Sequence, residues 1–282
     1  SDPVLPDGAV STTIRNCFGT TVSPADTTVS GDACAEYTAN AQSPGVSAGK
    51  TWVPGSGVRD DLPSSTITMK GSNYSGNVPL DALVLQDPAT VSGSQPAVAD
   101  TAFDYVTVTG LSHLVFPQGA DQVQIDVLTA DGTWHAGSPA GSLPTGATID
   151  GVALADIVGV RATFSNSGGG KLPVVTDAGD ADGDGVADTL RSTLRSSGKT
   201  IDVPPGKTVT VDNTSSAIGY AGKTPTSPAT ADAHYTITSG TVKVTPDKSL
   251  YPAGSTGNAG PDSPVTYLLQ IKNVGDRNLL AP

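Results

Sequence analysis

The chain repeats itself, and both ends of the sequence cut through the repeat. Four segments recur in the same order, each about 200 residues further along. The four pairs are 6–16 with 205–213, 37–38 with 235–236, 50–54 with 243–246, and 66–73 with 266–273. This period is far longer than that of a solenoid repeat, so each unit is expected to be a whole domain.

The position of the cut predicts how the chain is divided. We expect residues 1–45 to be the closing half of a β-sandwich module and residues 241–282 to be the opening half of the next. A complete module is expected from 46–88 plus 205–240. Residues 89–204 have no counterpart at either end. They are expected to form an inserted β-rich domain, either separate from that module or joined to it.

A half sandwich cannot bury its apolar face, and its edge strands leave backbone groups unpaired. The two terminal halves therefore need partners, and three arrangements are open. The halves can join each other within one chain, or the tail of one chain can complete the head of the next by strand addition. Alternatively, the sequence is taken from a longer tandem array. The last two arrangements predict a fibre or stalk, and the first predicts a two-domain protein.

Composition predicts an all-β protein. The chain holds 33 glycines and 22 prolines, and among its 27 acidic residues only Glu36 is a glutamate. Glycine, proline and aspartate suit turns, whereas glutamate suits helices. A net charge of −12 argues against nucleic acid and anionic membranes as partners. No apolar segment is long enough to span a bilayer, so no membrane insertion is expected.

Alternating apolar residues predict several strands along the chain. In the segment 158–164 the even-numbered residues form one apolar face. The Ser-, Gly- and Pro-rich segment 41–64 is instead expected to be a connection between domains. The strands expected inside the insertion and at the C-terminal end include 103–108, 111–116, 123–129, 133–136, 158–164, 188–195 and 265–271.

Cys17 and Cys34 are the only cysteines, and their counterparts in the second copy fall at about Thr214 and Asp232. Loss of both together is what a disulfide predicts, and closing so short a loop contributes about 3 kcal/mol in the chain-entropy model. A disulfide also implies an oxidising compartment. The alternative is two unrelated thiols, since the spacing does not fit a metal site.

One motif carries chemistry. Oxygen ligands recur at positions 1, 3, 5 and 9 of a tight loop with glycine at position 6, as Ca²⁺ requires. The predicted ligands are Asp180, Asp182, Asp184, the carbonyl of Val186, and Asp188. Position 12 is Arg191 rather than glutamate, so this is not a helix–loop–helix site. The loop resembles the aspartate-rich calcium loops of extracellular repeat proteins such as the thrombospondin type 3 repeat, which implies structural Ca²⁺; the alternative is an acidic solvated turn.

No zinc-binding pair, nucleophile elbow, phosphate-binding loop or dinucleotide fingerprint is present, so an enzyme is not expected. Trp52 and Trp134 are candidates for stacking on sugars, although half-buried tryptophans are common in sandwiches.

Two Lys–Asn pairs suggest a side-chain amide bond of the kind that some surface β-sandwiches carry. They are Lys70 with Asn73 and Lys272 with Asn273. A strand end followed by a turn asparagine explains the same residues.

The segment from Tyr267 to Asp276 resembles the Y-x-x-x-V-x-N-x-G-D strand of the conserved-repeat β-sandwich domains of bacterial cell-surface proteins, with Ile271 in place of Val. Residues 82–88 and 205–213 resemble that family's next and closing strands, and 190–195 resembles actinobacterial cell-wall proteins. The resemblance implies tandem immunoglobulin-like β-sandwiches with an inserted β-domain, outside the cell.

These observations together predict an extracellular structural module of a surface fibre or stalk. Its partners would be copies of itself, head to tail, joined by β-strand complementation or tandem repetition. The rival is a ligand-binding adhesin in which the 89–204 insertion recognises a host receptor or glycan. A clustered aromatic or polar groove on the insertion would favour the rival.

The calcium site should be weak, with a Kd of ~10⁻⁴ to 10⁻³ M, because it lacks the bidentate twelfth ligand. Isothermal titration of the wild-type chain with Ca²⁺ measures this constant. Replacing Asp182 and Asp184 together with Asn should abolish the heat of binding, because two carboxylate ligands lose their charge. Equal heats from the wild type and the double variant would contradict the site.

Overall fold

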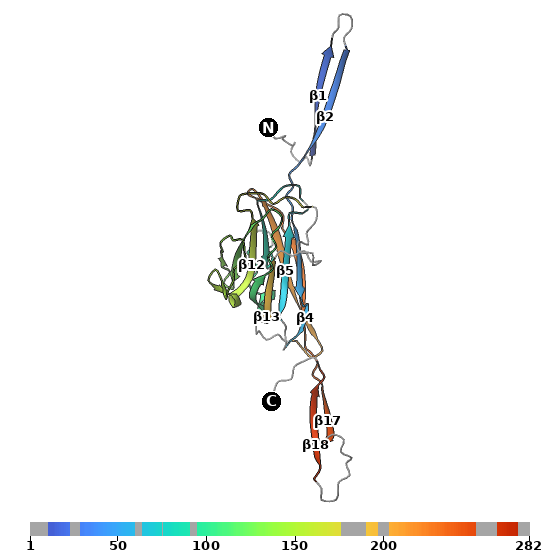
Figure 1. Ribbon diagram of the computed structural model, residues 1–282, viewed down its shortest axis with the longest axis vertical. Coiled ribbons are helices and arrows are strands. Elements are labelled where there is room, and N and C mark those ends of the chain that lie inside the picture. The colour runs from blue at the N-terminus through green and yellow to red at the C-terminus, as the bar shows by residue number, and fades with distance from the viewer. Residues whose placement is uncertain are drawn as a thin grey trace. The chain divides into compact units, whose positions relative to one another are not determined.

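A computed structural model describes residues 11–22, 29–59, 64–74, 76–90, 95–175, 190–196, 203–251 and 264–275. The described residues form β-strands and two short 3-10 turns, η1 (Ala102–Asp104) and η2 (Leu154–Asp156). The all-β prediction is therefore confirmed (Figure 1). The chain divides into two compact units, Ser1–Ser43 and Pro44–Pro282.

The first unit contains one antiparallel hairpin. Strand β1 (Ser11–Val22) pairs along its full length with β2 (Val29–Asn40). Cys17 lies directly opposite Cys34, and the two form a disulfide. The predicted disulfide is thus confirmed.

The second unit contains a sandwich of two sheets (Figure 1). The larger sheet has the order β4-β16-β14-β6-β12-β8-β9, with β15 paired to β14, and the smaller has the order β3-β5-β13-β7. The strands of the larger sheet are β4 (Ser56–Val58), β6 (Ala82–Asp87), β8 (Gln122–Thr129), β9 (Trp134–His135), β12 (Ile157–Ser165), β14 (Thr208–Ala221), β15 (Thr224–Pro225) and β16 (Ala229–Thr238). Those of the smaller sheet are β3 (Ser47–Val53), β5 (Ser65–Ser72), β7 (Val106–Ser112) and β13 (Leu190–Ser196).

Two further strand pairs complete the second unit. Strands β10 (Thr148–Ile149) and β11 (Val152–Ala153) form a small ribbon. Strand β17 (Val244–Tyr251) pairs with β18 (Thr266–Asn273) in a second antiparallel hairpin.

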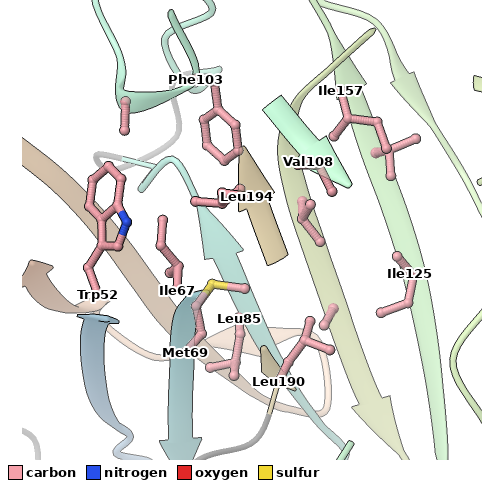
Figure 2. Packing of buried hydrophobic residues seen from close by; sticks show 14 of the residues in the cluster. Trp52, Ile67, Met69, Leu85, Phe103, Val108, Ile125, Ile157, Leu190 and Leu194 are labelled. Atoms are coloured by element: carbon pink, nitrogen blue, oxygen red, sulfur yellow. The ribbon is translucent and has the colours of Figure 1, made fainter. Parts of the chain in front are cut away.

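The core lies between the two sheets of the sandwich, because alternate residues of each strand point inward. Figure 2 shows Ile67 and Met69 of β5 packed among Leu85 of β6 and Leu190 and Leu194 of β13. The predicted apolar face of β12 is confirmed for Val160, Ala162 and Phe164. A register shift between Ile157 and Gly159 buries Ile157 in place of Val158, which is only partly buried.

The unmatched segment 89–204 contributes strands to both sheets of the sandwich. Strands β8 and β12 continue the sheet that holds β6 and β14, and β7 and β13 continue the sheet that holds β3 and β5. One hydrophobic cluster spans all of these strands. Strands β7, β8, β12 and β13 of 89–204 therefore lie in the same two sheets as strands of 46–88 and 205–240.

Two local predictions are wrong. Segment 41–64 is not only a connection, because it holds β3 and β4, and Trp52 of β3 is buried in the core. Residues 103–108 and 111–116 are not two strands. Phe103 lies in the η1 turn, and one strand, β7, then runs to Ser112. It ends there because His113 has a φ of 55°, which extended backbone does not adopt.

The shared core predicts a single unfolding transition for the sandwich. Leu85→Ala in the repeated part and Leu194→Ala in the insertion should each lower the free energy of unfolding by ~2–5 kcal/mol in the same transition. The exposed control Val174→Ala should change it by less than about 0.5 kcal/mol. Urea unfolding followed by circular dichroism measures all three. Two separable transitions, each sensitive to only one leucine, would contradict the shared core.

Candidate functional sites

The N-terminal hairpin has one apolar face and one polar face. Residues directly opposite each other in an antiparallel pair share a face, and successive residues alternate between faces. Ile14, Phe18 and Tyr37 therefore share one face, and all three are exposed, Phe18 by 72%. The other face carries the Arg15–Glu36 ion pair and the disulfide. The hairpin thus presents an apolar face that no described strand covers.

This hairpin has the same register as β14–β16 of the sandwich. In both, an aliphatic residue faces a tyrosine, and two positions further along an asparagine faces an alanine. The equivalent pairs are Ile14–Tyr37 with Val211–Tyr235, and Asn16–Ala35 with Asn213–Ala233. In the sandwich, Val211, Asn213 and Tyr235 are buried. The apolar face of β1–β2 is therefore the counterpart of a core face.

The disulfide occupies the position that the repeat predicts. The pair opposite each other in β14–β16 at the place of Cys17 and Cys34 is Thr214 and Asp232. There the Thr214 hydroxyl donates to Asp232 Oδ1 at 2.5 Å. The β14–β16 hairpin thus has a hydrogen bond at the register position where the β1–β2 hairpin has a disulfide.

The C-terminal hairpin β17–β18 is also apolar on one face. Tyr267, Leu269 and Ile271 alternate along β18 and are all exposed, Leu269 by 70%. Lys248 on β17 lies directly opposite Leu269, and its Nζ is 4.0 Å from the centre of the Tyr267 ring. The predicted apolar alternation of 265–271 is confirmed, but the described strands leave this face uncovered.

The register of β17–β18 matches that of β3–β5. Lys50 faces Met69 in the sandwich, and Lys248 faces Leu269 in the hairpin. Lys248 is therefore the counterpart of Lys50. The equivalence of Lys50 with Lys243 in the sequence comparison is wrong, because Lys243 precedes the first residue of β17.

The two matching hairpins of the sandwich contact each other. Strand β3 packs against β16 and β14, so β3–β5 and β14–β16 face one another across the core. Their counterparts are the C-terminal and the N-terminal hairpin of this chain. Each terminal hairpin thus has the register of one of the two hairpins that face each other in the sandwich.

A lysine, an aspartate and an asparagine meet inside the sandwich. Lys50 comes from β3 of the smaller sheet, and Asp87 and Asn213 come from β6 and β14 of the larger sheet. Lys50 Nζ lies 2.8 Å from Asp87 Oδ2. Asn213 Nδ2 donates to the same oxygen at 3.1 Å. The side chains of Lys50 and Asp87 are 0% and 4% exposed.

The surroundings of this cluster are largely apolar. Met69 of β5 lies directly opposite Lys50. Trp52 is two residues from Lys50 on β3, and Leu85 is two residues from Asp87 on β6. All three are buried, and Figure 2 shows them in the core. The Trp52 ring stacks 5.1 Å from the ring of Tyr235. Burial lowers the pKa of Lys50, and the Asp87 carboxylate only partly offsets this effect. The structure therefore favours the neutral amine of Lys50 more than water does.

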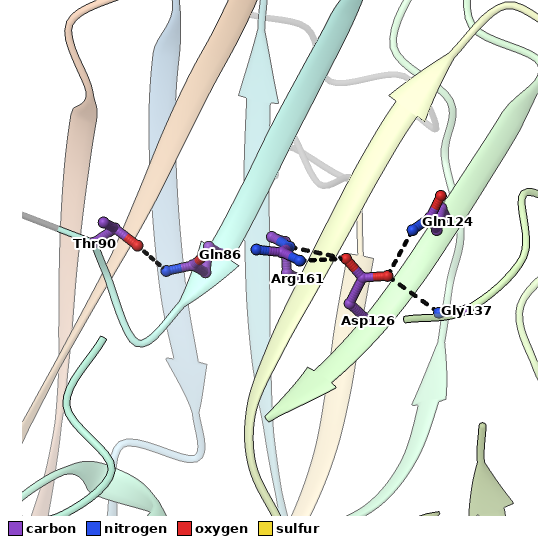
Figure 3. Close-up of polar contacts among 6 residues, drawn as sticks. All are labelled: Gln86, Thr90, Gln124, Asp126, Gly137 and Arg161. Carbon is purple, nitrogen blue, oxygen red and sulfur yellow. Dashed lines mark hydrogen bonds and ion pairs between the residues drawn. The ribbon is translucent and has the colours of Figure 1, made fainter. Parts of the chain in front are cut away.

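The outer face of the larger sheet carries a groove of about 410 Å³. Figure 3 shows Arg161 of β12 donating from Nε and a terminal nitrogen to Asp126 Oδ2, at 2.9 and 2.7 Å. Gln124 Nε2 and Gly137 N donate to the other oxygen of Asp126. The Arg161 guanidinium lies 4.3 Å from the centre of the Trp134 ring. The groove is lined by Val84, Gln86, Thr90, Gln95, Pro96, Trp134, Arg161, Ile218, Tyr220, Pro225, Thr226 and Pro228.

The two tryptophans lie in different environments. Trp52 is a core residue whose Nε1 donates to Ser65 Oγ at 2.9 Å, so it is not available for stacking on a sugar. Trp134 lines the outer groove. The predicted calcium ligands, Asp180 to Asp188, lie outside the described residues.

The two asparagines proposed from sequence for an amide bond make hydrogen bonds to backbone groups. Asn73 Nδ2 donates to the carbonyls of Val78 and Leu172. Asn273 Oδ1 accepts from the backbone N–H of Gly275. The Lys–Asp–Asn cluster was missed because its members are far apart in sequence. The available signal was a lysine and an asparagine at inward positions of alternating strands.

Comparison with protein-family models finds no match for the chain, and comparison with curated proteins finds none either. Among solved structures, the chain is similar to the C-terminal domain of the AgI/II polypeptide BspA of Streptococcus agalactiae, with a TM-score of 0.29 and 11% sequence identity. The match covers 79% of this chain and 59% of that one. In the described residues no helix is long and apolar enough to cross a membrane.

The shared register predicts that the disulfide can be transferred between copies. In the double variant T214C/D232C the two sulfurs should form a second disulfide, because these positions lie opposite each other as Cys17 and Cys34 do. Titration of free thiols under denaturing, non-reducing conditions should find none. The single variant T214C should show one free thiol. Two free thiols in the oxidised double variant would contradict the equivalence of the hairpins.

Proposed function

We propose that this chain is an extracellular structural module of a surface fibre or stalk. Neighbouring copies join head to tail when the C-terminal hairpin β17–β18 of one packs against the N-terminal hairpin β1–β2 of the next. The neighbours are either separate chains or consecutive parts of a longer one. The observation that carries the proposal is that each terminal hairpin matches, in register, one of two elements that face each other in the sandwich.

The exposed faces supply the driving force for this joint. Full burial of a side chain such as Phe18 or Leu269 contributes about 1.5–3 kcal/mol. Isolated two-stranded hairpins are at best marginally stable in water, so packing against a partner hairpin also stabilises the strands themselves. The polar faces, with the Arg15–Glu36 ion pair and the disulfide, remain toward solvent in such a joint.

An extracellular setting is supported by the disulfide, which persists in oxidising compartments. Calcium at Asp180–Asp188 remains part of the proposal as a second stiffening element, since its two positive charges would offset the repulsion among four carboxylates in one loop. The proposed partners are copies of the chain itself.

Two complementary variants test the joint. Phe18→Asp blocks the head and Leu269→Asp blocks the tail, because each buries a charge in the proposed interface. Sedimentation velocity should show wild-type oligomers that grow with concentration, monomers for each variant alone, and dimers but nothing larger in their mixture. Gln270→Asp, on the opposite face of β18, should behave as the wild type.

The same experiment separates the three arrangements of the terminal halves. Closure within one chain would give a wild-type monomer at all concentrations. If the neighbours are parts of a longer chain, the test is a direct fusion of two copies. Hydrogen exchange of the backbone amides should then be slowed in the two hairpins at the junction, β17–β18 of the first copy and β1–β2 of the second. Lack of protection in the fusion together with a monomeric wild type would overturn the proposal.

A second candidate function is ligand binding in the outer groove. The groove is concave, is lined by Trp134 and Tyr220, and draws several of its walls from the inserted segment. It is the weaker candidate because Asp126 already neutralises Arg161, and Arg161 already covers one face of the Trp134 ring.

Tryptophan fluorescence tests the groove directly. Trp52 is buried in the core, so a change in emission on adding an oligosaccharide reports on Trp134. A saturable change that is lost in Trp134→Phe and kept in the Leu269→Asp variant would support a binding function. An unchanged spectrum across neutral and acidic oligosaccharides would exclude glycans as ligands of this groove.

A further inference from the structure

The buried Lys–Asp–Asn cluster is difficult to explain as a source of stability alone. Removing a lysine and an aspartate from water costs several kcal/mol per ion, and a single ion pair rarely repays that cost without further hydrogen bonds. Among the described residues, neither Lys50 Nζ nor Asp87 Oδ1 has a hydrogen-bond partner of good geometry. Apolar residues of similar volume would fill this part of the core at lower cost.

The same arrangement is well suited to a reaction. A neutral amine is a nucleophile, and burial favours the neutral form of Lys50. The Asn213 side chain is a carboxamide, whose carbon is electrophilic. Lys50 Nζ and Asn213 Nδ2 contact one carboxylate oxygen, Asp87 Oδ2, from two different strands. The nucleophile, the leaving nitrogen and a proton carrier therefore meet at one atom.

We propose that Lys50 and Asn213 are joined by an amide bond between Lys50 Nζ and Asn213 Cγ, formed inside the folded sandwich with Asp87 as the proton carrier. The bond connects β3 of the smaller sheet to β14 of the larger one. It uses neither of the Lys–Asn pairs that are close in sequence. The bond itself does not depend on the proposed stalk function.

The reaction is balanced without any external reagent. Asp87 takes a proton from the Lys50 ammonium, which leaves a neutral amine and a carboxylic acid. The amine nitrogen attacks Asn213 Cγ and forms a tetrahedral intermediate. Asp87 then delivers its proton to Asn213 Nδ2, which already lies 3.1 Å from Oδ2, and the Cγ–Nδ2 bond breaks to release ammonia. The attacking nitrogen gives up one further proton through Asp87, and no atom is oxidised or reduced.

The packing of the core supports each step. Orientation on fixed strands replaces a bimolecular encounter by an intramolecular one, which lowers the entropic part of the barrier. Trp52, Met69 and Leu85 on neighbouring inward positions help to exclude water, which would otherwise compete as nucleophile. Asp87 is placed to pass its proton to Asn213 Nδ2, which makes that nitrogen a leaving group. Asn213 is therefore the reacting partner.

The terminal hairpins carry only part of this machinery. Asn16 corresponds to Asn213, and Lys248 corresponds to Lys50. Asp87 comes from β6, which belongs to neither matching hairpin. We therefore expect one amide bond in an isolated chain.

Intact mass spectrometry of the wild-type chain is the decisive experiment. The expected mass is that of the sequence with its disulfide, less one molecule of ammonia. Digestion should yield a branched peptide that joins the Lys50 segment to the Asn213 segment, with no cleavage by trypsin after Lys50. A full-length mass without loss of ammonia, together with a linear peptide cleaved at Lys50, would overturn the proposal without the need for any variant.

Variants then assign the roles. Lys50→Met, Asn213→Leu and Asp87→Asn should each have the full mass of the variant sequence, with no loss of ammonia. Circular dichroism should show that the sheets are retained. The controls Lys70→Met and Asn273→Ala should keep the loss, because they alter only the pairs that are close in sequence. If Asp87→Asn still loses ammonia, Asp87 is not the proton carrier. If Asn213→Leu still loses ammonia, Asn213 is not the residue that Lys50 attacks.

Discussion

The constraint on which this structure depends is that a two-stranded hairpin has no interior. Strands β1 and β2 pair with each other along their length, but the apolar side chains of one face have nothing to cover them within the pair. The same is true of β17 and β18. A sequence that keeps Phe18 and Leu269 on such faces resembles a core strand rather than a solvated one. The alternation is that of a strand with a second layer against it, and under the proposed function another copy provides this layer.

Register turns this general constraint into a specific pairing. A shift of one residue would move every apolar side chain to the other face, so agreement in register between two hairpins is informative. Ile14 and Tyr37 face each other as Val211 and Tyr235 do, although the second pair is buried and the first is not. The outer faces are free to diverge, and they do: a disulfide in one copy stands where Thr214 and Asp232 share a hydrogen bond in the other.

Local patterns predicted much of the fold but little of the chemistry. Alternation located β12, β13 and β18, because period two follows directly from the pleat. It failed for segment 41–64, where glycine and serine hide the strand that carries Trp52 and Lys50. Sequence also could not decide how the insertion joins the module, since strand order within a sheet is set by pairing between distant segments. The Lys50, Asp87 and Asn213 cluster was beyond its reach for the same reason: each residue is unremarkable on its own strand.

The position of this cluster links the core to the proposed stalk. Lys50 lies in the first strand of the sandwich, and Asn213 lies in β14, shortly before the chain leaves through β16 toward the C-terminal hairpin. A covalent bond between these two residues encloses most of the sandwich in a closed loop. Tension that enters at β3 then passes to β14 through the amide, and the strands between them carry none of it. The hydrogen bonds and hydrophobic contacts of the enclosed sheets would then set the shape of the module, while the amide and the joints between hairpins would bear the load. In such a stalk the hairpin joints lie outside the loop, and the described strands of the two terminal hairpins carry no counterpart of Asp87, which comes from β6.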